Sequence, residues 1–166
     1  PRGMIAPVAI WTHYWKREMV EQGEGTFVGH TASNGFRQRG VAAGDRLYVI
    51  SISGGRLRVV GRLDVEDIVT QQRATELFGR TMGDGTEHIV ARPGSGTPRR
   101  SDAYVASQRL GEVEFVGPDG EVMPPKLNRS GQPDVLALQG VREITLKTAL
   151  LFDQVLGLKA SEGDPA

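Results

Sequence analysis

The chain has 166 residues, no cysteine, and 20 basic residues that balance 20 acidic ones, so its formal net charge is zero at pH 7. These totals exclude disulfides, thiolate metal sites and a uniformly basic surface, so any contact with nucleic acid has to be local. No apolar run approaches the length of a transmembrane helix, so no membrane association is expected. The absence of cysteine is compatible with a reducing compartment, and we expect a cytoplasmic protein.

The length fits one domain, which we expect over residues 1–157, followed by a flexible tail over residues 158–166. The 22 glycines imply many turns and favour a strand-rich fold.

The first part of the chain predicts a strand over residues 5–15, because strand side chains alternate between two faces. This alternation puts Trp11, His13 and Trp15 on one face. Residues 16–25 are polar and predict a short helix or a loop. The hydroxyl and amide groups of residues 31–34 suit a helix N-cap, and residues 35–39 predict one helical turn or a loop.

A hairpin is predicted next. Residues 46–53 are apolar on both faces, which is typical of a central strand. Gly54 and Gly55 suit a two-residue hairpin loop, and residues 56–65 predict the returning strand. Gly61 inside that strand indicates a bulge.

The rest of the chain alternates helices, short strands and loops. Helices are predicted over residues 66–78 and from Thr145 to Gly157, where apolar residues follow the helical period. Residues 92–101 are rich in Pro, Gly, Ser and Arg and predict a mobile loop. Short strands are predicted over residues 88–91, 112–116, 135–138 and 141–144.

Motifs for metal binding and catalysis are missing from the sequence. The histidines His13, His30 and His88 have no metal-ligand spacing, so no metal and no cofactor are expected. The glycine pairs at 23–25 and 94–96 do not match a phosphate-binding loop, and no nucleophile elbow occurs. We therefore predict no catalytic residue.

The strongest local enrichment is aromatic, since Trp11, Tyr14 and Trp15 lie within five positions. These rings either pack a sheet against a helix or offer a surface on which planar bases stack, at about 1–3 kcal/mol per base. In the second case Trp11 and Trp15 would enclose a ring ligand together with His13.

Basic residues flank this strand and the 31–40 segment and could contact phosphates while the total charge stays neutral. They are Lys16, Arg17, Arg37, Arg39, Arg99 and Arg100.

Residues 33–65, SNGFRQRGVAAGDRLYVISISGGRLRVVGRLDV, resemble the centre of the PUA-like superfamily, especially its EVE and ASCH branches. The matching features are Asn34 and Arg37, the Gly44-Asp45 turn, the strand over 47–52 and the ending over 61–65. The opening strand over 10–15 also resembles the first strand of EVE domains. The Lys16-Arg-Glu18 segment departs from the Ser-Glu-Pro-like pattern that usually follows in EVE domains. The resemblance covers residues 5 to 70.

This resemblance implies an α+β fold, with a small mixed or mainly antiparallel β-barrel of five to seven strands flanked by helices. It also implies a module that binds nucleic acid, DNA or RNA, and reads a modified or flipped base in an aromatic pocket. The residues matched to that pocket are Trp11, His13, Trp15, Ser33, Asn34 and Arg37.

Two alternatives remain from the sequence. One is an ASCH-like RNA-processing ribonuclease that uses Lys16, Arg37 and Tyr48. The other is a protein-interaction or small-molecule-binding domain on the same barrel. The oligomeric state is left open.

Overall fold

A computed structural model describes residues 8–21 and 27–158 of the chain. The expected beginning of the first strand at residues 5–7, residues 22–25 of the predicted helix or loop over 16–25, and residues 159–166 of the predicted tail lie outside the described residues. Leu158 belongs to the folded part, since its backbone N–H donates to the carbonyl of Asp153 and its side chain packs against the core.

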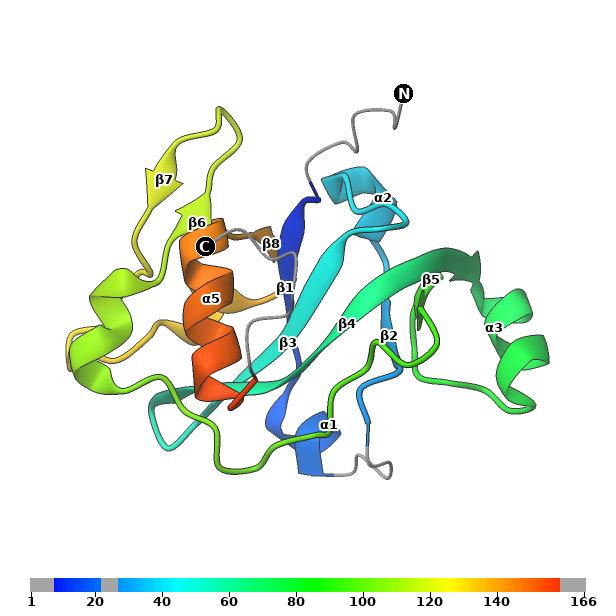
Figure 1. Ribbon diagram of the computed structural model, residues 1–166, viewed down its shortest axis with the longest axis horizontal. Coiled ribbons are helices and arrows are strands. Elements are labelled where there is room, and N and C mark those ends of the chain that lie inside the picture. The colour runs from blue at the N-terminus through cyan, green and yellow to red at the C-terminus, as the bar shows by residue number, and fades with distance from the viewer. Residues whose placement is uncertain (1–7, 22–26, 159–166) are drawn as a thin grey trace.

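A six-stranded sheet forms the centre of the molecule, in the order β2-β5-β4-β3-β1-β8 (Figure 1). Strand β1 runs parallel to β3, and the other neighbours are antiparallel. The strands are β1 (Ile10–Tyr14), β2 (His30–Ser33), β3 (Arg46–Ser53), β4 (Arg56–Thr70), β5 (Glu87–Ala91) and β8 (Val141–Glu143). The strands β6 (Phe115–Val116) and β7 (Val122–Met123) form a separate pair.

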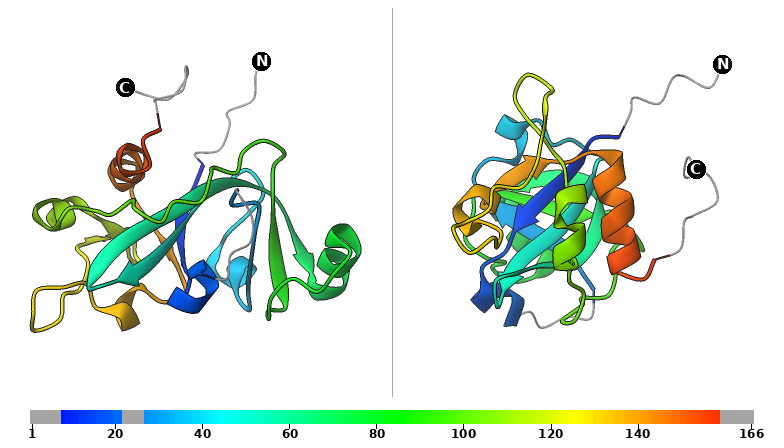
Figure 2. Two further views of the ribbon diagram at one scale, coloured as in Figure 1. Left: turned by 90° about the horizontal axis from the view of Figure 1, so that it is seen from below. Right: turned by 90° about the vertical axis from the view of Figure 1, so that its left-hand side faces the viewer.

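The sheet is strongly bent but open, so the expected closed barrel is not found among the described strands (Figure 2). Closure requires a ladder between the two edge strands. Strand β2 pairs with β5 and β8 pairs with β1, and no ladder joins β2 to β8. The α+β class is confirmed, and the 15-residue strand β4 joins the two halves of the sheet.

Each face of the sheet carries its own core. Tyr48 and Ile50 of β3 pack with α5 (Leu146–Val155) and the 3₁₀ helix η1 (Ser107–Glu112) on one face. Leu47 and Val49 face the opposite way and pack in a cluster with Trp11, Trp15 and Phe36 of α2 (Phe36–Arg39). The prediction that residues 46–53 form a central strand is therefore confirmed.

Two predicted helical segments are strands. Residues 31–34 do not cap a helix, because residues 30–33 pair with β5. Residues 66–70 continue β4, and the helix α3 covers only Gln71–Phe78, with the Thr70 hydroxyl accepting from the Arg73 N–H. The ladder with β5 outweighs the weak helical pattern of residues 66–70, since strand pairing satisfies their backbone groups.

Two other segments also differ from the sequence-based prediction. Residues 135–138 form a single helical turn, α4 (Val135–Leu138), because the Asp134 carboxylate accepts from the Leu136 N–H and caps it. The loop over residues 92–101 is held along β4 by backbone hydrogen bonds from Arg92, Thr97 and Arg100. The last predicted helix is confirmed, with Thr145 as its N-cap. The short helix α1 (Arg17–Glu21) follows β1.

Gly61 lies at the predicted bulge, since the register of β3 and β4 shifts where Val49 faces Gly61 and Ile50 faces Val59. A Cβ at Gly61 would lie 2.6 Å from Val28 Cγ2 and 2.9 Å from Thr97 Oγ1. The bulge thus lets the segments that contain Val28 and Thr97 pass close to β4.

We expect Gly61→Ala to lower the free energy of unfolding by about 1–3 kcal/mol, because overpacking forces neighbouring atoms apart. Urea denaturation measures the change. Gly111→Ala is the matched control, since its added Cβ would meet nothing within 4 Å. Equal stability of the two variants would contradict the close approach at Gly61.

None of the helices in the described parts of the chain combines the length and the apolar character needed to cross a membrane.

Candidate functional site

A pocket of about 590 Å³ opens beside β2, between the end of α1 and the loop that follows α3. This volume is in the range of sites for small ligands. Four of its side chains carry rings, two are arginines and one is an aspartate. The lining residues are Trp15, Met19, Phe27, Gly29, His30, Thr31, Ala32, Phe78, Arg80, Thr81, Met82, Gly83, Asp84 and Arg99.

Trp15 is the predicted site residue that reaches this pocket, although its side chain is largely buried. Its indole N–H donates to Thr31 Oγ1 at 2.8 Å, which holds the ring against β2. The Arg99 guanidinium lies over the indole, 4.8 Å from the ring centroid. Burial and the nearby Arg58 lower the pKa of Arg99. Arg99 thus covers one face of the indole, and both residues line the pocket.

The exposed ring of the pocket belongs to Phe27, whose side chain is 60% exposed. Phe78, at the end of α3, contacts His30 edge-on with ring centroids 5.1 Å apart. Both phenylalanines line the pocket. Together with Trp15, they bring aromatic side chains from three separate segments to one pocket.

A chain of histidines lies behind the pocket. His30 Nε2 lies 2.7 Å from His88 Nδ1, and His88 Nε2 lies 2.7 Å from Gln71 Oε1 and 3.0 Å from the Gly85 carbonyl. His13 Nδ1 shares the Thr31 hydroxyl with Trp15, at 2.6 Å. Thus the three histidines, which are distant in sequence, gather around β2.

This environment keeps two of the histidines uncharged. Burial, and secondarily His30, lowers the pKa of His13 to about 4. Burial, and secondarily His88, lowers the pKa of His30 to about 4. At pH 7 the His30 side chain, which lines the pocket, therefore carries no charge.

Trp11 does not join the pocket. It is 6% exposed, packs in the core, and donates its indole N–H to Asp45 Oδ2 at 2.9 Å. His13 is also buried and stacks edge-on against Phe36. The expectation of one open stacking face formed by Trp11, His13 and Trp15 is therefore corrected, because the bend of the sheet encloses that face in a core.

The residues matched from the 31–40 segment lie away from the pocket lining. Ser33 ends β2, and Asn34 Oδ1 accepts a hydrogen bond from the Thr86 N–H at 3.0 Å. Arg37 donates to the Ile68 carbonyl and pairs with Glu87 at 3.9 Å. In this structure, Asn34 and Arg37 join α2 to β4 and β5.

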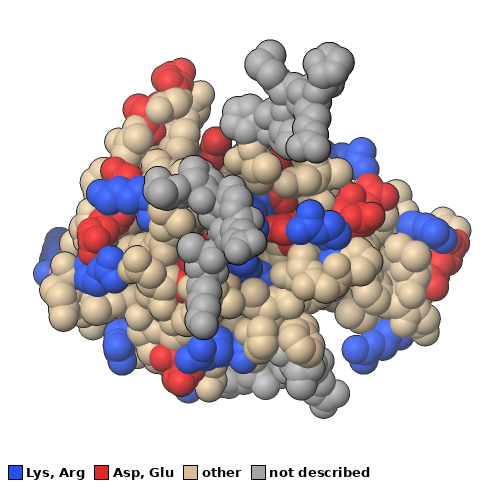
Figure 3. Space-filling view, in the orientation of Figure 1, with Lys and Arg blue, Asp and Glu red and all other residues tan. Residues whose placement is uncertain are grey.

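The predicted phosphate-contacting residues differ in their surroundings. Lys16, Arg17 and Arg39 are exposed, whereas Arg100 is engaged with Asp102 and with the Leu156 carbonyl. Basic and acidic side chains are interspersed on the face drawn in Figure 3. Of this predicted set, only Arg99 lines the pocket.

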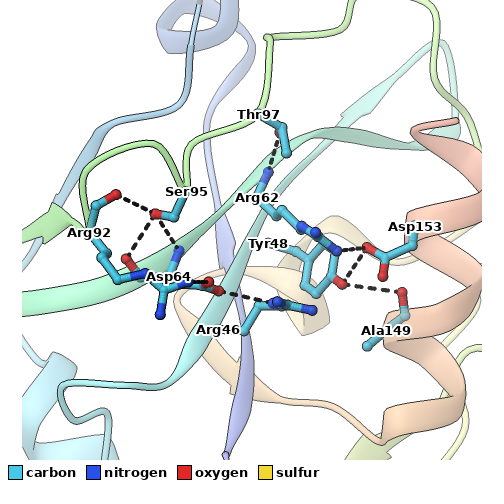
Figure 4. Close-up of polar contacts among 9 residues, drawn as sticks. All are labelled: Arg46, Tyr48, Arg62, Asp64, Arg92, Ser95, Thr97, Ala149 and Asp153. Atoms are coloured by element: carbon cyan, nitrogen blue, oxygen red, sulfur yellow. Dashed lines mark hydrogen bonds and ion pairs between the residues drawn. The ribbon is translucent and has the colours of Figure 1, made fainter. Parts of the chain in front are cut away.

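The residues considered for a ribonuclease are not brought together. Tyr48 is fully buried and donates its hydroxyl to Asp153 Oδ1 at 2.6 Å, beneath α5 (Figure 4). Arg37 contacts Ile68 of β4 and Glu87 of β5. Lys16 lies directly before α1. In the described parts of the chain, no group of three His, Asp or Glu side chains could hold a metal ion.

Sequence reasoning missed Phe27, His30, Phe78 and Arg80 as site residues. Phe27 is followed by Val28 and Phe78 follows Leu77, so both read as ordinary core positions in the sequence. No local signal marked them as site residues, because only the tertiary structure brings them to the same pocket as Trp15.

Comparison with known proteins gives structural neighbours only. No protein-family model matches the chain, and no curated protein matches it. A mutant ASCH protein from Zymomonas mobilis has a TM-score of 0.47 at 14% identity, over 88% of this chain and 95% of that chain. A second mutant of that protein has a TM-score of 0.46 at 13% identity, over 91% of this chain and 99% of that chain.

The third solved structure is the YTH domain of the Zygosaccharomyces rouxii MRB1 protein in complex with N6-methyladenosine RNA. It has a TM-score of 0.47 at 14% identity and covers 99% of this chain and 96% of that chain.

Proposed function

We propose that this chain is a nucleic-acid-binding module that takes one unpaired base, modified or flipped out of a strand, into the pocket beside β2. The observation that carries the proposal is the composition of the pocket wall. Rings of Trp15, Phe27 and Phe78 line one cavity together with the guanidinium of Arg99. Base recognition outside a duplex uses aromatic faces and planar guanidinium groups of this kind.

The charge distribution fits a local contact. The chain has no net charge, so general affinity for a polyanion is low. Arg80 and Arg99 line the pocket, and Lys16 is exposed next to Trp15 in the sequence. These cations would meet the phosphates on either side of a bound base, while the pocket would supply the selectivity.

We expect Phe27→Ala to weaken binding about 5- to 150-fold, because a lost stacking contact costs about 1–3 kcal/mol. The phenyl ring is largely exposed, so the fold should be retained. Fluorescence anisotropy with short RNA and DNA strands, with and without methylated bases, identifies the preferred ligand and then measures the loss.

Leu136→Ala is the matched control, because Leu136 is 77% exposed and lies in α4, outside the pocket lining. The Leu136→Ala variant should bind the strand with the affinity of the unchanged chain. If no strand binds at low salt, the module is a protein- or small-molecule-binding domain instead. Equal affinities of the Phe27→Ala and Leu136→Ala variants would show that the strand binds outside this pocket.

A further inference from the structure

His30 differs from the other pocket residues because a hydrogen-bond chain determines which of its nitrogens carries a proton. The chain begins at the Gly85 carbonyl, which can only accept. His88 Nε2 must therefore carry a hydrogen, which Gln71 Oε1 also accepts. The amide of Gln71 is oriented accordingly, since its Nε2 points to the Gly83 carbonyl at 3.5 Å.

The surroundings of His88 determine whether its second ring nitrogen, Nδ1, carries a hydrogen. This residue is fully buried, and its hydrogen-bond partners are His30, Gln71 and Gly85, which include no carboxylate. The hydrogen of His88 is already assigned to Nε2, and a second hydrogen on a fully buried ring that no carboxylate contacts is disfavoured, so Nδ1 is the bare nitrogen. His88 Nδ1 must then accept, and His30 Nε2 must donate across the 2.7 Å that separates them.

This assignment leaves Nδ1 of His30 as a bare acceptor. Its pKa, lowered to about 4 by burial and by His88, keeps the ring neutral at pH 7. Nδ1 makes no hydrogen bond to another described residue. Within the described parts of the chain, no buried side-chain nitrogen or oxygen lacks a partner, so Nδ1 reaches solvent. His30 is itself a lining residue of the pocket.

We propose that His30 determines specificity by accepting, at Nδ1, a hydrogen bond from an N–H on the edge of the bound base. The proposal rests on the proposed function and adds the class of ligand, an aromatic heterocycle that presents an amino group or a ring N–H. His88 and Gln71 are positioning residues, because they hold the His30 tautomer without touching the ligand. A base whose edge offers only acceptors would face an acceptor and be rejected.

The first test needs no ligand. Long-range ¹H–¹⁵N spectra of the intact chain at pH 7 distinguish the two tautomers of each histidine ring. We expect His30 as the Nε2–H form, and assignment comes from the loss of its signals in His30→Phe. A dominant Nδ1–H form of His30 would overturn the proposal.

The second test compares matched ligands on the unchanged chain. The base that binds best is replaced, in the same short strand, by an analogue without the donor: purine for adenine and pyrimidin-2-one for cytosine. Guanine has both kinds of donor, so it is replaced in turn by hypoxanthine, which lacks the amino group, and by 1-methylguanine, which lacks the ring N–H, and one of the two should bind more weakly. For uracil the analogue is 3-methyluracil. We expect the analogue to bind about 10- to 100-fold more weakly, because binding it would take Nδ1 away from water without supplying a donor. In His30→Phe this ratio should fall to near one.

The outcomes separate the two proposals. If a strand binds but its analogue binds equally well, His30 is not the specificity residue and the base-binding module stands. If no strand binds, both proposals fall, whatever the tautomer. If His30→Phe does not fold, the ratio measured on the unchanged chain still decides.

Discussion

Asp153→Ala is expected to lower the free energy of unfolding by about 3–5 kcal/mol, because it leaves buried partners without their counter-charge. Asp153 Oδ1 accepts from the Tyr48 hydroxyl at 2.6 Å and from Arg62 at 2.7 Å (Figure 4). The side chains of Arg62 and Asp153 are only 17% and 13% exposed. Burial, with the hydrogen bond to Asp153, raises the pKa of Tyr48, so the hydroxyl remains a donor at any physiological pH.

Chemical denaturation of the variant and of a matched surface variant measures this effect. Glu76→Ala removes an ion pair with Arg73 whose side chains are more than half exposed, and we expect a change of less than about 1 kcal/mol. Tyr48→Phe alone should cost about 1 kcal/mol, since it removes only the hydroxyl. If Asp153→Ala were no more damaging than Glu76→Ala, the contacts beneath α5 would not hold this helix to the sheet.

Lowering the pH from 7 to 4 is expected to destabilise the fold by about 3 kcal/mol through His13 alone. Burial holds the pKa of His13 at about 4 in the folded chain, against the usual value of 6.5 for a histidine side chain in water. Below pH 6.5 the unfolded chain therefore binds a proton that the folded chain excludes, so stability falls as the pH falls. The loss ends near pH 4, where the folded chain also binds the proton. His30 acts in the same direction.

Urea unfolding at pH 7, 5.5 and 4.5 measures this slope, and His13→Gln isolates the contribution of one ring. Glutamine can still accept from the Thr31 hydroxyl, which His13 contacts at 2.6 Å. The variant should lose less stability between pH 7 and 4.5 than the unchanged chain, because carboxylates elsewhere titrate equally in both. Identical slopes would show that His13 is not buried in its neutral form.

The hairpin of β3 and β4 illustrates what local sequence predicts well. Residues 46–53 are apolar on both faces, and both strands meet at Gly54 and Gly55, whose φ angles are 59° and 73°. Left-handed backbone of this kind favours glycine, so the turn could be located from the sequence. The last helix was predictable for the same reason, since Thr145 supplies its cap locally.

Residues 66–70 and 135–138 show where local patterns fail. Strand β4 extends to Thr70 because β5, some twenty residues later, pairs with it. Residues 135–138 (VLAL) are a short apolar run that fits either element, and the cap at Asp134 produces a helical turn where no described strand pairs with them. The first outcome depends on a partner that a short window of sequence does not contain, whereas the second depends on a cap that the strand prediction overlooked.

The candidate site was predicted only in part. Trp15 was singled out and lines the pocket, whereas Trp11, on the same face of β1, lies in the core with Asp45. Alternation along a strand assigns both rings to one face, but it does not say how far the core extends over that face. The bend of the sheet covers Trp11 and leaves the edge of Trp15 at the pocket.

The sequence by itself determined the α+β class, the central hairpin, the capped C-terminal helix and the enrichment of aromatic residues near position 15. These features depend on periodicity, turn chemistry and composition, which are local. Only the tertiary structure decided that the sheet stays open and that Phe27, Phe78 and Arg99 surround one pocket with Trp15. It also decided that His30 and His88 share a hydrogen bond, because the pairing of β2 with β5 joins segments 58 residues apart.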